Sequence, residues 1–138
     1  TLGQGGGDIN YDSSRNYLCF AMRNIVGFSR SGSYKGNGNA DGTFVYTGFK
    51  PAFVLFKRAD GTESWMIQDN RRPGYNPQGG NLFANTNGTE STDARFDFVS
   101  NGFKARSGNQ NTDGSLHVYI AFAESPFVNS NGVPNNAR

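Results

Sequence analysis

The stretch RFDFVSNGFKAR, residues Arg95 to Arg106, carries the clearest folding signal in the sequence. Two runs of alternating apolar and polar residues flank Asn101-Gly102, a dipeptide that favours the positive φ angles of a type I′ turn. We therefore predict a β-hairpin with a two-residue loop, in which Ser100 opposes Phe103. This register places three aromatic side chains on the face that is expected to form the core: Phe96, Phe98 and Phe103.

Strand signals recur along the rest of the chain, whereas Gly, Asn or Pro interrupts nearly every window long enough for a helix. The chain has 138 residues, of which 19 are Gly and 14% are aromatic, a composition that favours one domain of short strands and tight turns. The pattern predicts an all-β fold, an antiparallel β-sandwich or a jelly-roll-like domain. The expected strands are Tyr17–Met22, Thr43–Thr47, Ala52–Arg58, Ser64–Asp69, Leu82–Asn85, Arg95–Ser100, Phe103–Arg106 and Leu116–Glu124.

The strand in SLHVYIAFAE, from Ser115 to Glu124, is apolar on both of its faces. Leu116, Val118, Ile120 and Phe122 alternate with His117, Tyr119, Ala121 and Ala123. A strand that is apolar on both faces is typical of the middle of a sheet, so we predict a central position for it.

Part of this strand is written twice, as YLCFAMRNIV at Tyr17 to Val26 and as YIAFAESPFV at Tyr119 to Val128. A tandem array explains the recurrence: residues 1–28 would end a preceding repeat or form an N-terminal lead-in and strand, and residues 29–138 would form one complete β-sandwich repeat. A start at Thr1 without Met fits either a trimmed product or an excised piece of a longer protein. The alternative is one sandwich with two similar core strands. Equivalent copies would each direct the same apolar side chains toward a core: Leu18 and Phe20, and Ile120 and Phe122.

A second recurrence lies in the loops, where NGNADGT at Asn37 to Thr43 and NQNTDGS at Asn109 to Ser115 share the pattern N-x-N-x-D-G-[ST]. Oxygen ligands at alternate positions resemble the start of a calcium loop, but Gly48 stands at the twelfth position, where a bidentate Glu is expected. The alternative is turn chemistry, in which Asx side chains close local turns before a strand. We favour turns and expect no metal.

Charge and hydropathy exclude two classes of partner. Only 17% of residues are charged and the formal net charge is +2, which lacks the concentrated positive field that nucleic acid requires. The longest apolar run, Val118 to Ala123, is far shorter than the roughly 20 residues that span a bilayer. We expect no nucleic-acid binding and no membrane insertion.

We expect no enzyme, no catalytic residues and no cofactor. The single histidine, His117, lies in an apolar strand, so we interpret it as a side chain packed against the core and not as a catalytic base. The single cysteine, Cys19, lies between apolar residues, so no internal disulfide or CxxC metal pair exists. Phosphate-binding and dinucleotide-binding motifs are missing. The 11 Asp and Glu leave a glycosidase-like carboxylate pair open, without a local motif to support it.

The segment WMIQDNRRPGYNPQGG gathers an aromatic face, donors and acceptors within a short loop. Such a combination can bind a sugar or an exposed peptide. In the alternative interpretation the only Trp is buried in the core and the arginines lie on a solvated rim, with the acid paired to one of them. The candidate ligand-binding residues are Trp65, Asp69, Arg71, Arg72, Tyr75 and Asn76.

Several ordered segments resemble a repeat domain, of unknown biochemical activity, found in tail-fibre-like and other virion proteins of tailed bacteriophages. These segments are SGSYKGNGNADGTFVYTGFKPAFVLFKR, WMIQDNRR, FVSNGFKAR, YIAFAESPF and NGVPNNAR. The resemblance covers nearly the whole chain from Ser29 onward.

The resemblance implies a structural or adhesive module of a bacteriophage tail fibre or spike, on the outside of the virion and assembled in the bacterial cytoplasm. The implied partners are other virion proteins, two further copies in a homotrimer, and a host-surface polysaccharide or envelope protein. The alternatives are a purely architectural spacer or decoration domain and, less favoured, a polysaccharide depolymerase.

Overall fold

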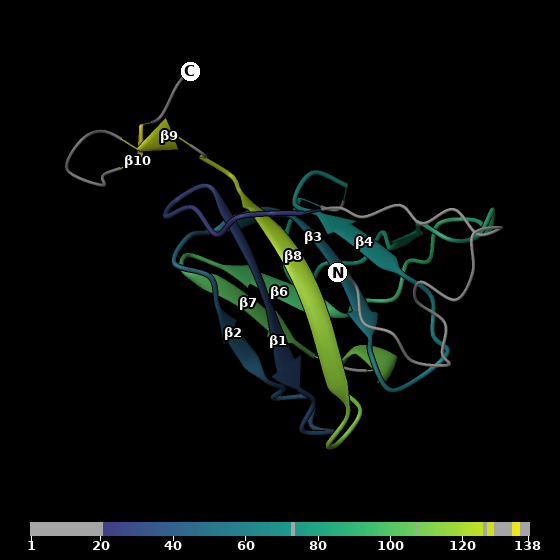
Figure 1. Ribbon diagram of the computed structural model, residues 1–138. Coiled ribbons are helices and arrows are strands. Elements are labelled where there is room, and N and C mark those ends of the chain that lie inside the picture. Colours follow the sequence, from purple (N-terminus) through teal and green to yellow (C-terminus); the bar gives the residue numbers. More distant parts are fainter. Residues whose placement is uncertain (1–20, 73, 107, 126, 129–133, 136–138) are drawn as a thin grey trace, which may run out of the picture.

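The structure is a computed structural model and describes residues 21–72, 74–106, 108–125, 127–128 and 134–135. Two antiparallel sheets pack face to face (Figure 1), which confirms the predicted β-sandwich. One sheet has five strands in the order β1-β8-β3-β4-β5, and the other has three in the order β2-β7-β6. Among the described residues no helix is long and apolar enough to cross a membrane.

The five-stranded sheet consists of β1 (Ser29–Lys35), β8 (Leu116–Ala123), β3 (Pro51–Arg58), β4 (Met66–Asp69) and β5 (Leu82–Phe83). The three-stranded sheet consists of β2 (Phe44–Tyr46), β7 (Gly102–Ala105) and β6 (Phe96–Val99). A short 3-10 helix, η1 (Gly108–Gln110), precedes β8, and β9 (Phe127–Val128) pairs with β10 (Pro134–Asn135) beyond it.

Strand β8 lies between β1 and β3, as its two apolar faces predict. Its residues His117, Tyr119, Ala121 and Ala123 are buried between the sheets. Ile120 and Phe122 are half-buried on the other side of the sheet, which we call the outer face. The prediction that these two side chains face the core is therefore wrong: the rings of His117 and Tyr119 fill that space. Leu18 and Phe20 lie outside the described residues.

The hairpin β6–β7 forms, but its register differs from the predicted one. Val99 pairs with Gly102 and Phe98 with Phe103, so the loop is Ser100-Asn101 and not Asn101-Gly102. Gly102 belongs to the strand because β2 approaches it closely: a Cβ there would lie 2.1 Å from the carbonyl oxygen of Val45. Glycine is used here for close backbone approach and not for turn geometry.

The predicted aromatic core of this hairpin is confirmed. Phe96, Phe98 and Phe103 are almost completely buried. Phe103 makes edge-to-face contacts with Phe96, Tyr34 and Tyr119, at ring-centroid distances of 5.5, 5.9 and 5.2 Å. Aromatic pairs in this geometry contribute beyond their buried area, so this cluster joins the two sheets.

Strand β1 was not expected from the sequence, because SRSGSYK carries little apolar alternation. It forms at the edge of the sheet, where it pairs with β8 along its whole length and buries the ring of Tyr34. The expected strand Tyr17–Met22 lies outside the described residues except for its last two, which are not in a strand. The boundary between residues 28 and 29 stays a prediction, although β1 begins at Ser29.

Candidate functional site

The connection from β4 to β5 lies at the end of the sandwich where β8 ends and where β1 and β3 begin (Figure 1). Backbone hydrogen bonds join the segments at this end: Asn70 N donates to Ala52 O at 3.0 Å, and Glu124 N donates to Lys50 O at 2.8 Å. The connection is therefore anchored to the five-stranded sheet where it begins.

Asp69 shapes the first part of this loop. One carboxylate oxygen accepts the backbone N–H groups of Arg71 at 2.9 Å and Arg72 at 3.0 Å, and the other pairs with Arg72 Nε at 2.7 Å. Partial burial raises the pKa of Asp69, but these donors outweigh it and hold the pKa below its usual value. Asp69 is thus ionised and engaged within the protein, as the alternative interpretation of the segment expects.

Arg72 is also engaged within the protein. Besides Asp69, its guanidinium pairs with Glu90 at 2.9 Å. It therefore ties the start of the loop to the segment that precedes β6. This arrangement makes Arg72 a positioning residue with little capacity for an external ligand.

Asn76 attaches the loop to the three-stranded sheet. Its Oδ1 accepts the N–H of Phe98 at 2.9 Å, and its Nδ2 donates to the carbonyl of Phe98 at 2.8 Å. Gln78 continues the attachment, since its backbone N–H donates to Phe96 O at 2.5 Å. The buried Gln68 of β4 donates to the carbonyls of Gln78 and Gly79 at 2.8 and 2.9 Å. The loop thus bridges both sheets.

Two of the predicted residues stay free on this anchored loop. Tyr75 is 72% exposed, and Arg71 is exposed with no ion-pair partner among the described residues. Both border an open groove of about 260 Å³, which we call the Tyr75 groove. Its lining comes from β6 and from the connections next to β3, β4 and β8: Lys50, Asn70, Arg71, Gly74, Tyr75, Asn76, Gln78, Phe98 and Glu124.

Tyr75 also borders a second depression, of about 420 Å³, which we call the Gly80 depression. Arg72 and Glu90 lie on its wall. The other lining residues include Pro77, Gly79, Gly80 and Thr92. One exposed aromatic ring therefore borders two hollows.

Trp65 does not belong to this groove. It is 40% exposed, so the interpretation that buries it in the core is wrong. It borders a separate apolar hollow together with Leu55, Val118 and Ile120 of the outer face. The reason is its place just before β4, since Met66 and not Trp65 points into the core. The sequence-predicted residues thus divide between two surfaces.

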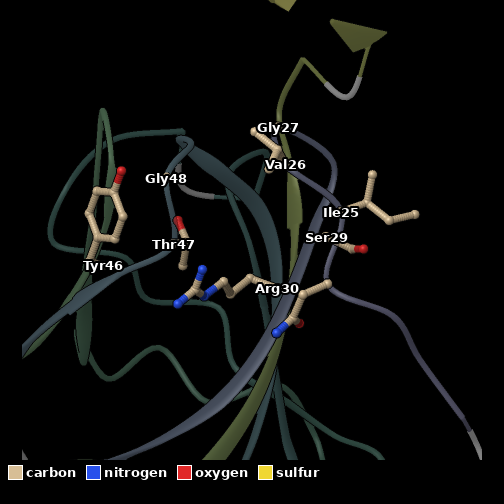
Figure 2. Close-up of a pocket in the computed structure, with 9 residues that line it drawn as sticks. Ile25, Val26, Gly27, Ser29, Arg30, Tyr46, Thr47 and Gly48 are labelled. Carbon is tan, nitrogen blue, oxygen red and sulfur yellow. The ribbon is translucent and has the colours of Figure 1, made fainter. Parts of the chain in front are cut away.

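A further depression was missed by sequence reasoning. It lies beside the turn before β1, and Figure 2 shows the side chain of Arg30 reaching across it toward Thr47. Like Arg71, Arg30 has no ion-pair partner in the described part of the chain. We call this the Arg30 depression. Its residues come from two segments that are distant in sequence, 24–30 and 46–48, so no local motif could reveal it.

The two Asn-rich loops pack against each other at the opposite end of the sandwich. Asn111 is 2% exposed; its Nδ2 donates to Asn37 Oδ1 at 2.8 Å and to Asn39 O at 2.7 Å, while its Oδ1 accepts Asn37 N at 3.1 Å. These bonds join the two loops, while Asn37 Oδ1 also accepts the N–H of Asn39 at 3.1 Å, a local turn of the predicted kind. Among the described residues no cluster of His, Cys, Asp or Glu is placed to hold a metal ion.

His117 is completely buried and stacks on Tyr34 at a ring-centroid distance of 4.9 Å. Its Nδ1 lies 3.1 Å from Ser115 O, and its Nε2 lies 2.7 Å from Asn109 O. Both ring nitrogens therefore face backbone carbonyls. His117 therefore packs in the core, as the sequence predicts.

A family model described as "Domain of unknown function (DUF7483)" matches residues 1–126. The chain belongs to this family. No curated protein and no solved structure matches the chain. The family is defined by a shared domain whose function is unknown, so the function of this chain has to be inferred from its geometry.

Proposed function

We propose that this DUF7483 domain is a non-catalytic adhesive module that binds a surface glycan through the Tyr75 groove. The proposal is supported by one arrangement: a loop bonded to both sheets leaves the side chains of Arg71 and Tyr75 free of partners in the described part of the chain, beside an open polar groove. Exposed aromatic rings with hydrogen-bonding groups around them suit sugars, which have an apolar face and a polar rim. The anchored loop loses little conformational entropy when a ligand binds.

The setting that we propose is the one that the sequence resemblance implies, a tail fibre or spike of a bacteriophage. A module there meets a host-surface polysaccharide or an envelope protein. The Tyr75 groove lies at the end of the sandwich where β4 and β8 end and β3 begins.

Adsorption of the purified domain to host cells, or to purified envelope polysaccharide, tests the proposal. We expect Tyr75→Ala to weaken adsorption at an unchanged melting temperature, because the side chain is exposed. Tyr46→Ala is the matched control, since it removes another exposed tyrosine outside the groove. Equal adsorption of both variants and the parent would remove the groove as a receptor site and favour an architectural spacer.

The outer face supports a second role, in assembly. Trp65 and Leu116 are 40% and 38% exposed there, next to the half-buried Val118 and Ile120. We propose that copies of the chain cover this face in a homotrimer, because partly exposed apolar side chains of this kind favour burial in an interface. Sedimentation of the chain and of a Trp65→Ser variant tests it: a parent that stays monomeric at micromolar concentration contradicts the trimer.

A further inference from the structure

We propose that the Tyr75 groove takes an acidic polysaccharide, with one sugar carboxylate held by the guanidinium of Arg71. This ligand class rests on the proposed function, since it concerns the same groove. It follows from how the charges around Tyr75 are paired.

Three cations border the loop, and two of them are already neutralised. Lys50 Nζ lies 2.8 Å from a carboxylate oxygen of Glu124, and Arg72 pairs with two acids. Arg71 alone has no carboxylate partner among the described residues, while its backbone N–H is fixed by Asp69. A guanidinium presents a planar fork of donors that matches a carboxylate in a bidentate pair. An acidic sugar can therefore bind without breaking an existing ion pair.

The one acid that lines the groove is already satisfied. Glu124 binds Lys50 through Oε2, and its Oε1 accepts Asn70 Nδ2 at 2.8 Å. Its charge is neutralised in place, so repulsion of an incoming carboxylate is reduced. The groove therefore offers a net positive charge, which comes from Arg71.

The far side of Tyr75 has the opposite character. In the Gly80 depression Arg72 is paired with Glu90, whose side chain is 45% exposed. A carboxylate is therefore disfavoured there, and a neutral sugar fits better over the backbone of Gly79 and Gly80. Since Tyr75 borders both hollows, the ligand is a chain that crosses the ring and not a single sugar.

One residue of the Tyr75 groove carries an unmet hydrogen-bond acceptor. Gln78 lines the groove and is 3% exposed; its Nε2 donates to Asn76 Oδ1 at 3.2 Å, but its Oε1 has no donor among the described residues. A buried polar atom without a partner destabilises the protein unless a donor reaches it. Sugar hydroxyl groups are donors of that kind.

The experiment compares a linear polyuronate with the same polymer after reduction of its carboxylates to alcohols. Binding of the whole chain to each polymer is measured by affinity electrophoresis and calorimetry. We expect the polyuronate to bind more tightly than the reduced polymer. Arg71→Ala should weaken binding of the polyuronate about five- to tenfold and binding of the reduced polymer by a smaller factor, because a hydrogen bond to a neutral hydroxyl is weaker than one to a carboxylate. Arg71→Lys should restore part of the affinity, because a lysine keeps the charge but not the fork.

Arg30→Ala is the matched control, because Arg30 is also an exposed arginine without an ion-pair partner but lines the Arg30 depression. An equal loss with Arg30→Ala would overturn the site, since the attraction would then be a general effect of net charge. Tyr75→Ala should weaken both polymers alike, because stacking on a sugar face does not depend on the carboxylate.

The outcomes separate the ligand class from the proposed function. Equal affinity for both polymers, lost with Tyr75→Ala and unaffected by Arg71→Ala, overturns the acidic ligand and keeps a glycan-binding groove. Binding of neither polymer overturns the acidic ligand, and cell adsorption that is insensitive to Tyr75→Ala overturns the groove as well.

Discussion

Replacement of Gly102 by alanine tests the register of the central hairpin. The new Cβ would lie 2.1 Å from Val45 O, whereas ordinary contact begins at 3.4 Å, so β2 has to move away by about 1 Å. That movement weakens the pairing of Val45 with Phe103 and the burial of Val45 between the sheets. Overpacking costs of this kind, with about one lost hydrogen bond, add up to about 3 kcal/mol.

Gly114→Ala is the matched control, because Gly114 has a φ of +70° and nothing within 4 Å of its virtual Cβ. Its cost is backbone strain alone, about 1 kcal/mol. At a slope of about 2 kcal/mol per molar urea, the two midpoints should differ by about 1 M. Urea unfolding followed by circular dichroism measures both. Equal midpoints would refute the close approach of β2 and would restore Asn101-Gly102 as the turn.

Three further predictions concern the core, the loops and the pH dependence. Phe103→Ala should destabilise the fold by about 4 kcal/mol, because the ring is buried. Phe44→Ala is the control and should cost less than about 1 kcal/mol, because Phe44 is exposed. Equal urea midpoints of the two variants would contradict the aromatic core. Asn111→Asp should lower the free energy of unfolding by about 2 kcal/mol or more, because it removes the two hydrogen bonds that Nδ2 donates. If added Ca²⁺ restored the stability of this variant, the turn interpretation of the loops would be contradicted. Asp69 has a lowered pKa in the folded protein, so its carboxylate stabilises the fold at neutral pH, and this stabilisation is lost as the pH falls below about 4. The difference in urea midpoint between the parent and Asp69→Asn should therefore shrink over that range. A difference that stays constant would contradict this role of Asp69.

The sequence predicted what depends on local alternation and missed what depends on distant partners. Phe96, Phe98 and Phe103 share a buried face because alternation along one strand decides it. The turn of the same hairpin was misplaced by one residue, because the approach of Val45 to Gly102 is a contact between segments far apart in sequence. Strand β1 was missed for the same reason, since its pairing with β8 and not its own composition makes it a strand.

The candidate site shows the same division. The polar loop after β4 was recognisable from its composition, but which of its residues are free depends on partners elsewhere. Asn76 is engaged because Phe98 lies beside it, and Arg72 because Glu90 does. Arg71 and Tyr75 are free because none of the described residues is such a partner for them.

This division of roles explains how a loop can present a defined surface on a small sandwich. Asp69 of β4 fixes its first part. Gln68 of β4 holds the carbonyls of Gln78 and Gly79 in its later part, and Asn76 and Gln78 attach that part to the edge of the other sheet. The conformational entropy of the loop is therefore lost on folding and not on binding. If the groove binds the glycan that we propose, exchanging the exposed residues would change the ligand while the anchors keep the backbone. The same sandwich can thus carry different surface chemistry on one end without a change in its core.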